Sequence, residues 1–80
     1  MSRQTELDRI CKSRNLPDLK VGAICLCEGV EGVIVGGNCS NNLDVVFGDN
    51  NFVSNCHPHY KFRILNGLGG YSYESADCYE

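Results

Sequence analysis

The stretch VGAICLCEGVEGVIVGG, residues 21–37, decides the fold that the sequence predicts. It holds two short apolar segments, GAICLC at 22–27 and EGVIVGG at 31–37, both rich in β-branched residues or cysteine. Gly29 and Gly32 lie where the first segment gives way to the second, and glycine supplies the backbone freedom of a tight turn. Short apolar runs bounded by glycine are typical of strands. The stretch therefore predicts two neighbouring β-strands.

Three more strands are predicted farther along the chain. LDVVFGD (43–49) alternates apolar and other residues, NFVSN (51–55) follows an Asp-Asn-Asn turn, and YKFRIL (60–65) alternates again. Such alternation marks strands with one buried face. Because the connections are short and contain no helix, we expect an antiparallel sheet. In so short a chain this sheet should curl to remove its edges, which predicts a mainly β fold built on a small five-stranded barrel.

A short helix is predicted before the strands, over residues 4–15. Leu7, Ile10 and Cys11 form one apolar stripe at helical spacing, and Pro17 prevents the helix from continuing. A helix this short is marginal alone, so the stripe must dock on another surface. We expect it to pack on its own domain. The alternative is that its basic face meets a partner through Arg9, Lys12 and Arg14.

Residues 66–80, NGLGGYSYESADCYE, are predicted to form a mobile acidic tail that carries tyrosines. The segment has few aliphatic residues, so it offers little apolar surface to bury. The alternative is that Tyr71, Tyr73 and Tyr79 lie along the barrel or dock on a partner, because tyrosines supply large contact area at low entropic cost.

Residues 20–65 resemble a known fold family. In VGAICLCEGVEGVIVGG an apolar strand is followed by Gly-x-x-Gly (Gly29, Gly32) and a second strand, which resembles the opening of SH3-like barrels of the KOW-like kind. LDVVFGDNNFVSNCHPHYKF (43–62) is similar to the second half of small barrel proteins from phages and prophages. The resemblance implies a small SH3-like barrel, one turn of 3₁₀ helix at HPHY (57–60), and a ligand surface beside Tyr60.

Charge is distributed unevenly along the 80 residues. The net charge is −3, yet residues 21–60 contain four acidic residues and no Lys or Arg. This acidic middle is compatible with a basic protein partner. The first residues show no signal-peptide core, and no run is long enough to span a membrane, so we expect a single cytoplasmic domain. In that compartment the six cysteines stay reduced and act mainly as small apolar residues.

The histidines and cysteines raise the question of a metal or catalytic site. The chain has neither a C-x-x-C pair nor H-x₃₋₅-H spacing, so a zinc site is a minority interpretation, with Cys25, Cys27, Cys56 and His59 as its ligands. A Cys56–His57 dyad is disfavoured because adjacent side chains on a strand point to opposite faces. We therefore expect no catalytic residue, no cofactor and no enzymatic activity.

The segment NCHPHYKF (55–62) is instead predicted to be the turn before the last strand, and to carry contact residues. The sequence favours a non-enzymatic binding module, a phage or prophage accessory protein that could modulate a host machine or a defence system. The alternatives are a KOW-like nucleic-acid-binding module and a small zinc-stabilised domain. We expect a monomer or weak dimer with a protein partner, nucleic acid being the second candidate. The predicted partner-binding residues are His59, Tyr60, Lys61, Phe62, Arg63, Arg9, Lys12 and Arg14.

Overall fold

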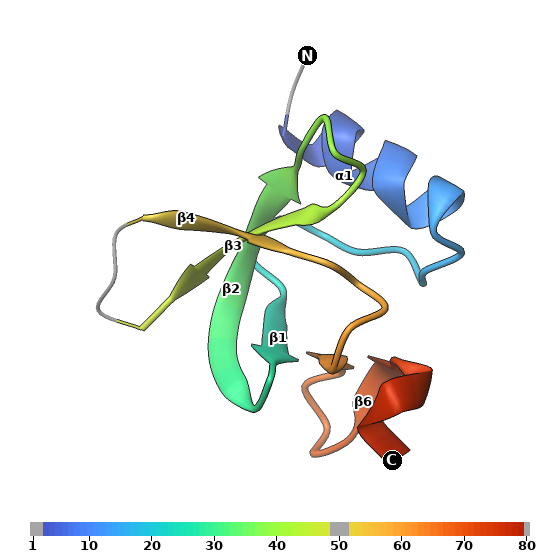
Figure 1. Cartoon of the computed structure of the whole chain (residues 1–80), viewed down its shortest axis with the longest axis vertical. Helices are drawn as coiled ribbons and strands as arrows, with labels where there is room; N and C mark the ends of the chain where they lie inside the picture. Colours follow the sequence, from blue (N-terminus) through green and yellow to red (C-terminus); the bar gives the residue numbers. More distant parts are fainter. Residues whose placement is uncertain (1–2, 49–51, 80) are drawn as a thin grey trace.

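The structure is a computed structural model that describes residues 3–48 and 52–79 (Figure 1). One N-terminal helix precedes a single antiparallel sheet, whose strands are ordered β4-β3-β2-β1-β5-β6. In chain order the elements are α1 (Arg3–Ser13), β1 (Ile24–Cys27), β2 (Val30–Gly37), β3 (Leu43–Phe47), β4 (Val53–Cys56), β5 (Phe62–Leu65), β6 (Tyr71–Glu74) and the 3₁₀ helix η1 (Ala76–Tyr79).

The mainly β class and the N-terminal helix are confirmed, but the closed five-stranded barrel is wrong. The described residues contain six strands, and the sheet does not close. The reason is that β5 pairs with β1 on one side and with β6 on the other, so that β4 and β6 are the two edges. The turn predicted at 49–51, and the strand ends that adjoin it, lie outside the described residues.

The sixth strand lies in the segment that was expected to be a mobile tail. Ser75 attaches it to the start of β5: its amide donates to the Phe62 carbonyl at 2.9 Å, and its hydroxyl accepts from the Phe62 amide at 2.9 Å. Asp77 accepts a hydrogen bond from the Lys61 amide at 2.8 Å. Ser75 is 1% exposed. Polar residues, rather than an apolar run, therefore hold this part of the chain in place.

The β1–β2 hairpin turns more tightly than predicted. Cys27 pairs with Val30, so that only Glu28 and Gly29 form the loop. Both have positive φ, 53° and 83°, which is the geometry of a type I′ turn. Gly29 suits this backbone, whereas Glu28 adopts it at a steric cost. The second strand therefore begins at Val30 rather than at Glu31.

The core lies between α1 and the inner face of the sheet. Leu7, Ile10 and Cys11 of α1 are buried, as the apolar stripe predicted. They join Ile34, Val45 and Phe62 in one cluster. Close approach requires glycine on β2: a Cβ on Gly32 would lie 2.6 Å from Cγ1 of Val45, and one on Gly37 would meet Ile10 and lie 3.0 Å from the Glu6 carbonyl oxygen.

Candidate functional site

Residues 57–61 form the predicted turn between β4 and β5, as a hydrogen-bonded turn and not as the 3₁₀ helix that the resemblance implies. The Tyr60 amide donates to the His57 carbonyl at 3.2 Å, and Pro58 between them is fully buried. The rings of His57 and His59 are exposed, with centroids 5.6 Å apart. Partial burial, Arg14 and His59 all lower the pKa of His57. Tyr60 is 50% exposed, so two of the predicted contact residues, His59 and Tyr60, are at the surface.

Phe62 does not belong to this exposed group. Its ring is 0% exposed and packs in the core with Ile64. Alternation along YKFRIL would place Tyr60 on the same face as Phe62, but it is interrupted at Lys61, whose φ is +45°. Tyr60 is therefore at the surface while Phe62 belongs to the buried face, and a partner cannot contact Phe62 without opening the core.

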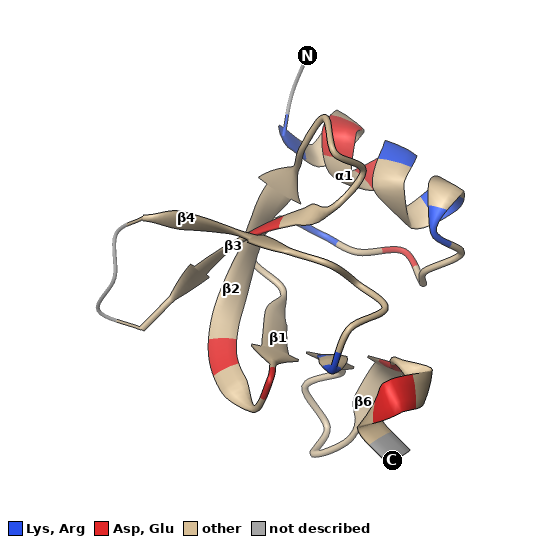
Figure 2. Cartoon of the chain, in the orientation of Figure 1, with Lys and Arg blue, Asp and Glu red and all other residues tan. Residues whose placement is uncertain are grey.

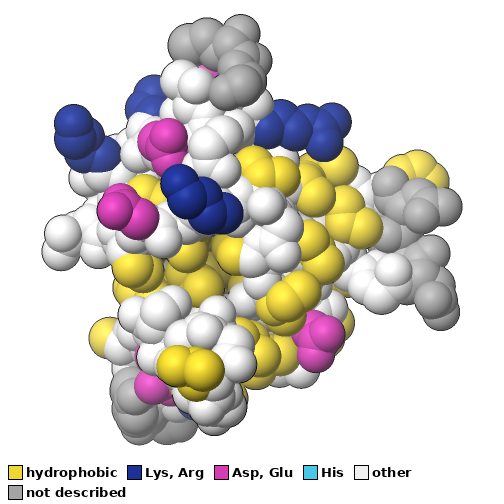
Figure 3. Space-filling view, turned by 180° about the vertical axis from the view of Figure 1, so that it is seen from behind, with side chains coloured by type: hydrophobic (Ala, Val, Ile, Leu, Met, Phe, Trp, Pro, Cys, Tyr) yellow, Lys and Arg dark blue, Asp and Glu magenta, His cyan; other side chains and the backbone are white. Residues whose placement is uncertain are grey.

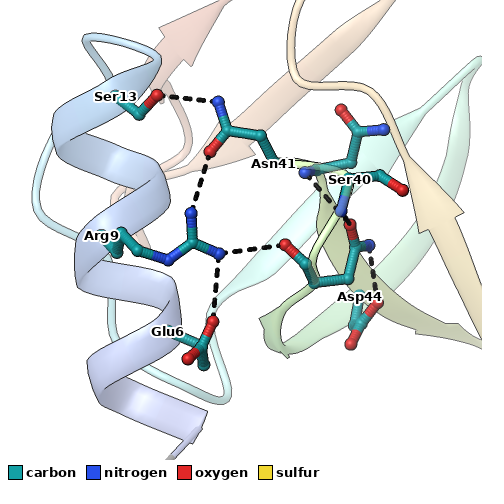
Figure 4. A network of polar contacts seen from close by, with 8 residues as sticks. Glu6, Arg9, Ser13, Ser40, Asn41 and Asp44 are labelled. Atoms are coloured by element: carbon teal, nitrogen blue, oxygen red, sulfur yellow. Dashed lines mark hydrogen bonds and ion pairs between the residues drawn. The ribbon is translucent and has the colours of Figure 1, made fainter.

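Two basic residues of the N-terminal segment, Arg9 on α1 and Arg14 just after it, are used within the protein, and Figure 4 shows the contacts of Arg9. Arg9 forms an ion pair with Glu6 at 3.0 Å and donates to the Asn38 carbonyl at 3.1 Å. Arg14 donates from Nε to the Asn41 carbonyl at 2.9 Å and from a terminal nitrogen to the Asn42 side chain at 3.0 Å. These contacts fasten α1 to the β2–β3 loop. Lys12 is exposed.

Lys61 and Arg63 lie instead beside acidic residues, at a cleft of about 490 Å³ between the β1–β2 turn, β5 and η1. Its lining residues are Leu26, Glu28, Gly29, Lys61, Arg63, Asp77 and Cys78. Nε of Arg63 is 3.0 Å from Oε2 of Glu74, and its guanidinium lies 5.2 Å from the centroid of the Tyr71 ring. The Ser75 hydroxyl and the Lys61 amide lower the pKa of Asp77. Charges of both signs thus meet at this cleft.

The predicted basic contact residues therefore do not form one surface. Arg9 and Arg14 hold the β2–β3 loop, while Arg63 is paired with Glu74. Figure 2 shows both basic and acidic residues along α1 and acidic residues at the β1–β2 turn. A polyanion needs a continuous basic surface, so this distribution gives little support to phosphate binding.

Three of the four residues in the minority zinc interpretation lie in or against the core. Cys25 is 0% exposed and Cys56 is 4% exposed, and the partly buried Cys27 packs against the same core. Burial raises the pKa of Cys25 to about 12 and also raises that of Cys56. His59 lies apart, with Nε2 3.3 Å from the Arg14 carbonyl. Within the part of the chain that the structure describes, no group of three or more His, Cys, Asp or Glu side chains could hold a metal ion.

The outer face of the sheet is the feature that the sequence analysis missed. Register pairs Ile24 with Val33, Val33 with Val46, and Val46 with Val53, so that four aliphatic side chains form a row across β1, β2, β3 and β4. Three are partly exposed and Val53 is 56% exposed. We call these four residues the valine row. Its signal was present, since 22–27 and 33–35 are apolar at consecutive positions and not only at alternate ones.

Acidic side chains accompany the valine row. Alternation along the strands places Glu31 of β2 and Asp44 of β3 on the same outer face. Glu31 is exposed, and Oδ1 of Asp44 accepts a hydrogen bond from Asn38 at 2.9 Å. Seen from behind the view of Figure 1, hydrophobic side chains gather in one broad patch with both basic and acidic side chains near its margin (Figure 3). Such a patch is typical of an interaction surface.

Comparisons with protein-family models, with curated proteins and with solved structures found no match for this chain. None of the described helices is long and apolar enough to cross a membrane.

Proposed function

We propose that this protein is a non-enzymatic module that binds another protein through the outer face of its sheet. The observation that carries the proposal is the valine row, which extends over four strands and ends in the exposed Val53. α1 packs on the opposite side, with its stripe in the core. An apolar sheet face left open to solvent gains free energy when a partner covers it.

The acidic residues around this face support a partner with basic character. Between Val21 and Tyr60 the chain has no Lys or Arg, whereas Glu31 and Asp44 lie on the outer face. Complementary charge around an apolar patch accelerates association and selects the partner. The proposed partner surface is therefore apolar at its centre and basic at its rim.

Site-specific photo-crosslinking tests the proposal. A photoreactive phenylalanine analogue replaces Val53 in one variant and Val30 in the other, and each is irradiated in a bacterial lysate with and without nuclease. Val30 is the matched control because it is 55% exposed, against 56% for Val53, and it pairs with Cys27 on the inner side of the sheet. We expect a discrete protein adduct at position 53 that survives nuclease and is absent at position 30.

Two results would contradict the proposal. One is equal crosslinking from the two positions, since that indicates non-specific contact. The other is loss of the position 53 adduct on nuclease treatment, since that indicates an association held by nucleic acid.

A further inference from the structure

The two edges of the sheet differ in how they are protected from pairing with another strand. A β6 neighbour would meet a bulge, because the β5–β6 register shifts between Ile64 and Leu65. It would also meet the charge of Glu74, which is paired with Arg63 at 3.0 Å. Bulges and charged side chains are the devices by which proteins discourage edge pairing. β6 thus has the features of a protected edge.

β4 has none of these features. Its four residues, Val53–Cys56, include no charged side chain and no proline, and they pair with β3 in continuous register from Val46–Val53 to Leu43–Cys56. In the sheet formed by residues 3–48 and 52–79, no strand lies beyond β4. At its start Phe52 and Val53 are 78% and 56% exposed. An extended, uncharged edge with exposed apolar side chains is a template for an added strand.

Charge indicates what kind of strand fits this edge. A strand added beside β4 would lie two strand spacings, about 10 Å, from the β3 residue Asp44, which is within reach of a lysine or arginine side chain. A second copy of this chain would bring its own segment 21–60 to the same place, and that segment contains acidic residues but no Lys or Arg. Like charges brought together disfavour self-pairing, and opposite charges favour a basic strand.

We infer that β4 binds an extended basic segment of another protein as an additional antiparallel strand. On the outer face, the side chain of the bound segment opposite Val53 is apolar and continues the valine row by one position, and the next outward side chain, opposite Asn55, is basic and lies toward Asp44. This inference rests on the proposed function and specifies its mode, in which backbone hydrogen bonds supply affinity and side chains at alternate positions supply specificity.

Defined peptides test the inference on the full chain. The probe is an eight-residue peptide in which every second residue is threonine and the positions between are alternately valine and lysine, so that valine and lysine share one face of the strand; the controls are the same peptide with glutamate in place of lysine and the valine–lysine peptide with alternate amides N-methylated. Affinity is measured by titration, and hydrogen exchange of the Val53–Cys56 amides is followed by NMR. We expect the valine–lysine peptide to bind at least about tenfold more tightly than either control, a difference of about 1.4 kcal/mol. We also expect it to slow exchange at those β4 amides that do not bond to β3.

Variants locate the effect. Val53→Lys places a cation on the edge and should weaken binding of the basic peptide at least about fivefold, whereas Val30→Lys, on the inner side, should leave it unchanged. Equal affinity for the N-methylated peptide, or binding without protection of β4, would overturn strand addition. So would a dimer, detected by sedimentation, that protects the same amides without peptide.

The outcomes separate this inference from the function on which it rests. If no peptide binds, yet the photo-crosslinker at position 53 still captures a protein, the outer face is a binding surface and strand addition at β4 is wrong. If neither experiment gives a signal at β4, both are wrong.

Discussion

Individual backbone positions show where this fold carries conformational cost. Glu28 and Lys61 both have positive φ without being glycine, 53° and 45°. They are neighbours in space, since the Glu28 amide donates to the Lys61 carbonyl at 2.9 Å, and both line the charged cleft. Non-glycine residues adopt this left-handed backbone conformation only where the surrounding contacts stabilise it. The hairpin turn and the entry to β5 therefore constrain each other.

Replacing Glu28 tests the turn geometry. Type I′ turns favour asparagine followed by glycine, so Glu28→Asn should stabilise the fold by about 0.5–1 kcal/mol. Glu28→Val should destabilise it, because a β-branched residue resists positive φ. The free energy of unfolding in urea measures both changes. The same sign for the two variants would show that the lost carboxylate, and not the backbone, determines the effect.

Adjacent glycines on β2 allow a second test at single-residue resolution. A Cβ on Gly37 would collide with Ile10 and lie 3.0 Å from the Glu6 carbonyl oxygen, whereas one on Gly36 would meet Cβ of Arg3 at an ordinary 3.4 Å. Gly37→Ala should therefore destabilise the protein by about 1–3 kcal/mol by displacing α1. Gly36→Ala should have little effect. Similar unfolding free energies for the two variants would show that α1 does not pack this closely.

At the scale of elements, polar contacts connect the parts that apolar patterning does not. Asn38 donates to Asp44 at 2.9 Å and to Asn55 at 2.7 Å, and its oxygen accepts from the Ser40 and Asn42 amides. The β2–β3 loop is thus tied to β3 and β4 by one residue. Arg9 and Arg14 then tie the same loop to α1.

This arrangement predicts different effects for two basic residues of the N-terminal segment. Arg14→Ala removes two hydrogen bonds of a charged group and leaves the largely buried Asn42 without that donor, so it should cost about 1.5–3 kcal/mol. Lys12→Ala, at an exposed position, should change stability by less than about 0.5 kcal/mol. Thermal unfolding measures both. If the two variants were equally stable, the fold would not depend on Arg14, and Arg14 would again be a candidate for partner contact.

The attachment of η1 to β5 should make stability depend on pH. Because the folded state lowers the pKa of Asp77, its contribution is present above the ordinary value of 3.8 and is lost as pH falls through the lower, folded pKa. Asp77→Asn should therefore reduce stability at neutral pH and flatten the decline in acid. Asp18→Asn, at an exposed carboxylate, controls for removal of one charge. Melting curves from pH 7 to pH 2 that are parallel for Asp77→Asn and the parent chain would contradict this account.

The same polar contacts explain how far the sequence could predict the structure. The helix and five strands follow from apolar spacing, which local sequence reveals. β6 does not follow from such spacing. Its tyrosine-rich sequence YSYE is followed by Ser75 and Asp77, which attach it to Phe62 and Lys61, 13 and 16 residues earlier in the chain. Sequence alternation also places Tyr60 and Phe62 on one face, because the left-handed backbone at Lys61 that separates them is not marked by a glycine. The valine row required the register of four strands, which no local pattern supplies.

For the whole molecule, the sheet is unequal in both its faces and its edges. The inner face packs on α1 and on Tyr73 of β6, whose hydroxyl donates to the Pro58 carbonyl at 2.8 Å. The outer face carries the valine row with acidic neighbours, and it ends at the unprotected β4. Burial of one face supplies stability, while exposure of the other leaves a surface for a partner. The proposed function assigns a use to that asymmetry.

Thiol reactivity tests whether the inner side is closed as one unit. Cys39 is exposed, whereas Cys25 and Cys56 are 0% and 4% exposed, and burial raises the pKa of Cys25 to about 12. Because the thiolate is the reactive form, iodoacetamide at pH 8 should modify Cys39 first and should modify Cys25 and Cys56 only when the core opens. Mass spectrometry of timed samples gives the order. In guanidinium the three should react alike, and early modification of Cys25 or Cys56 in the native protein would mean that the core opens at β1 or at β4 without global unfolding.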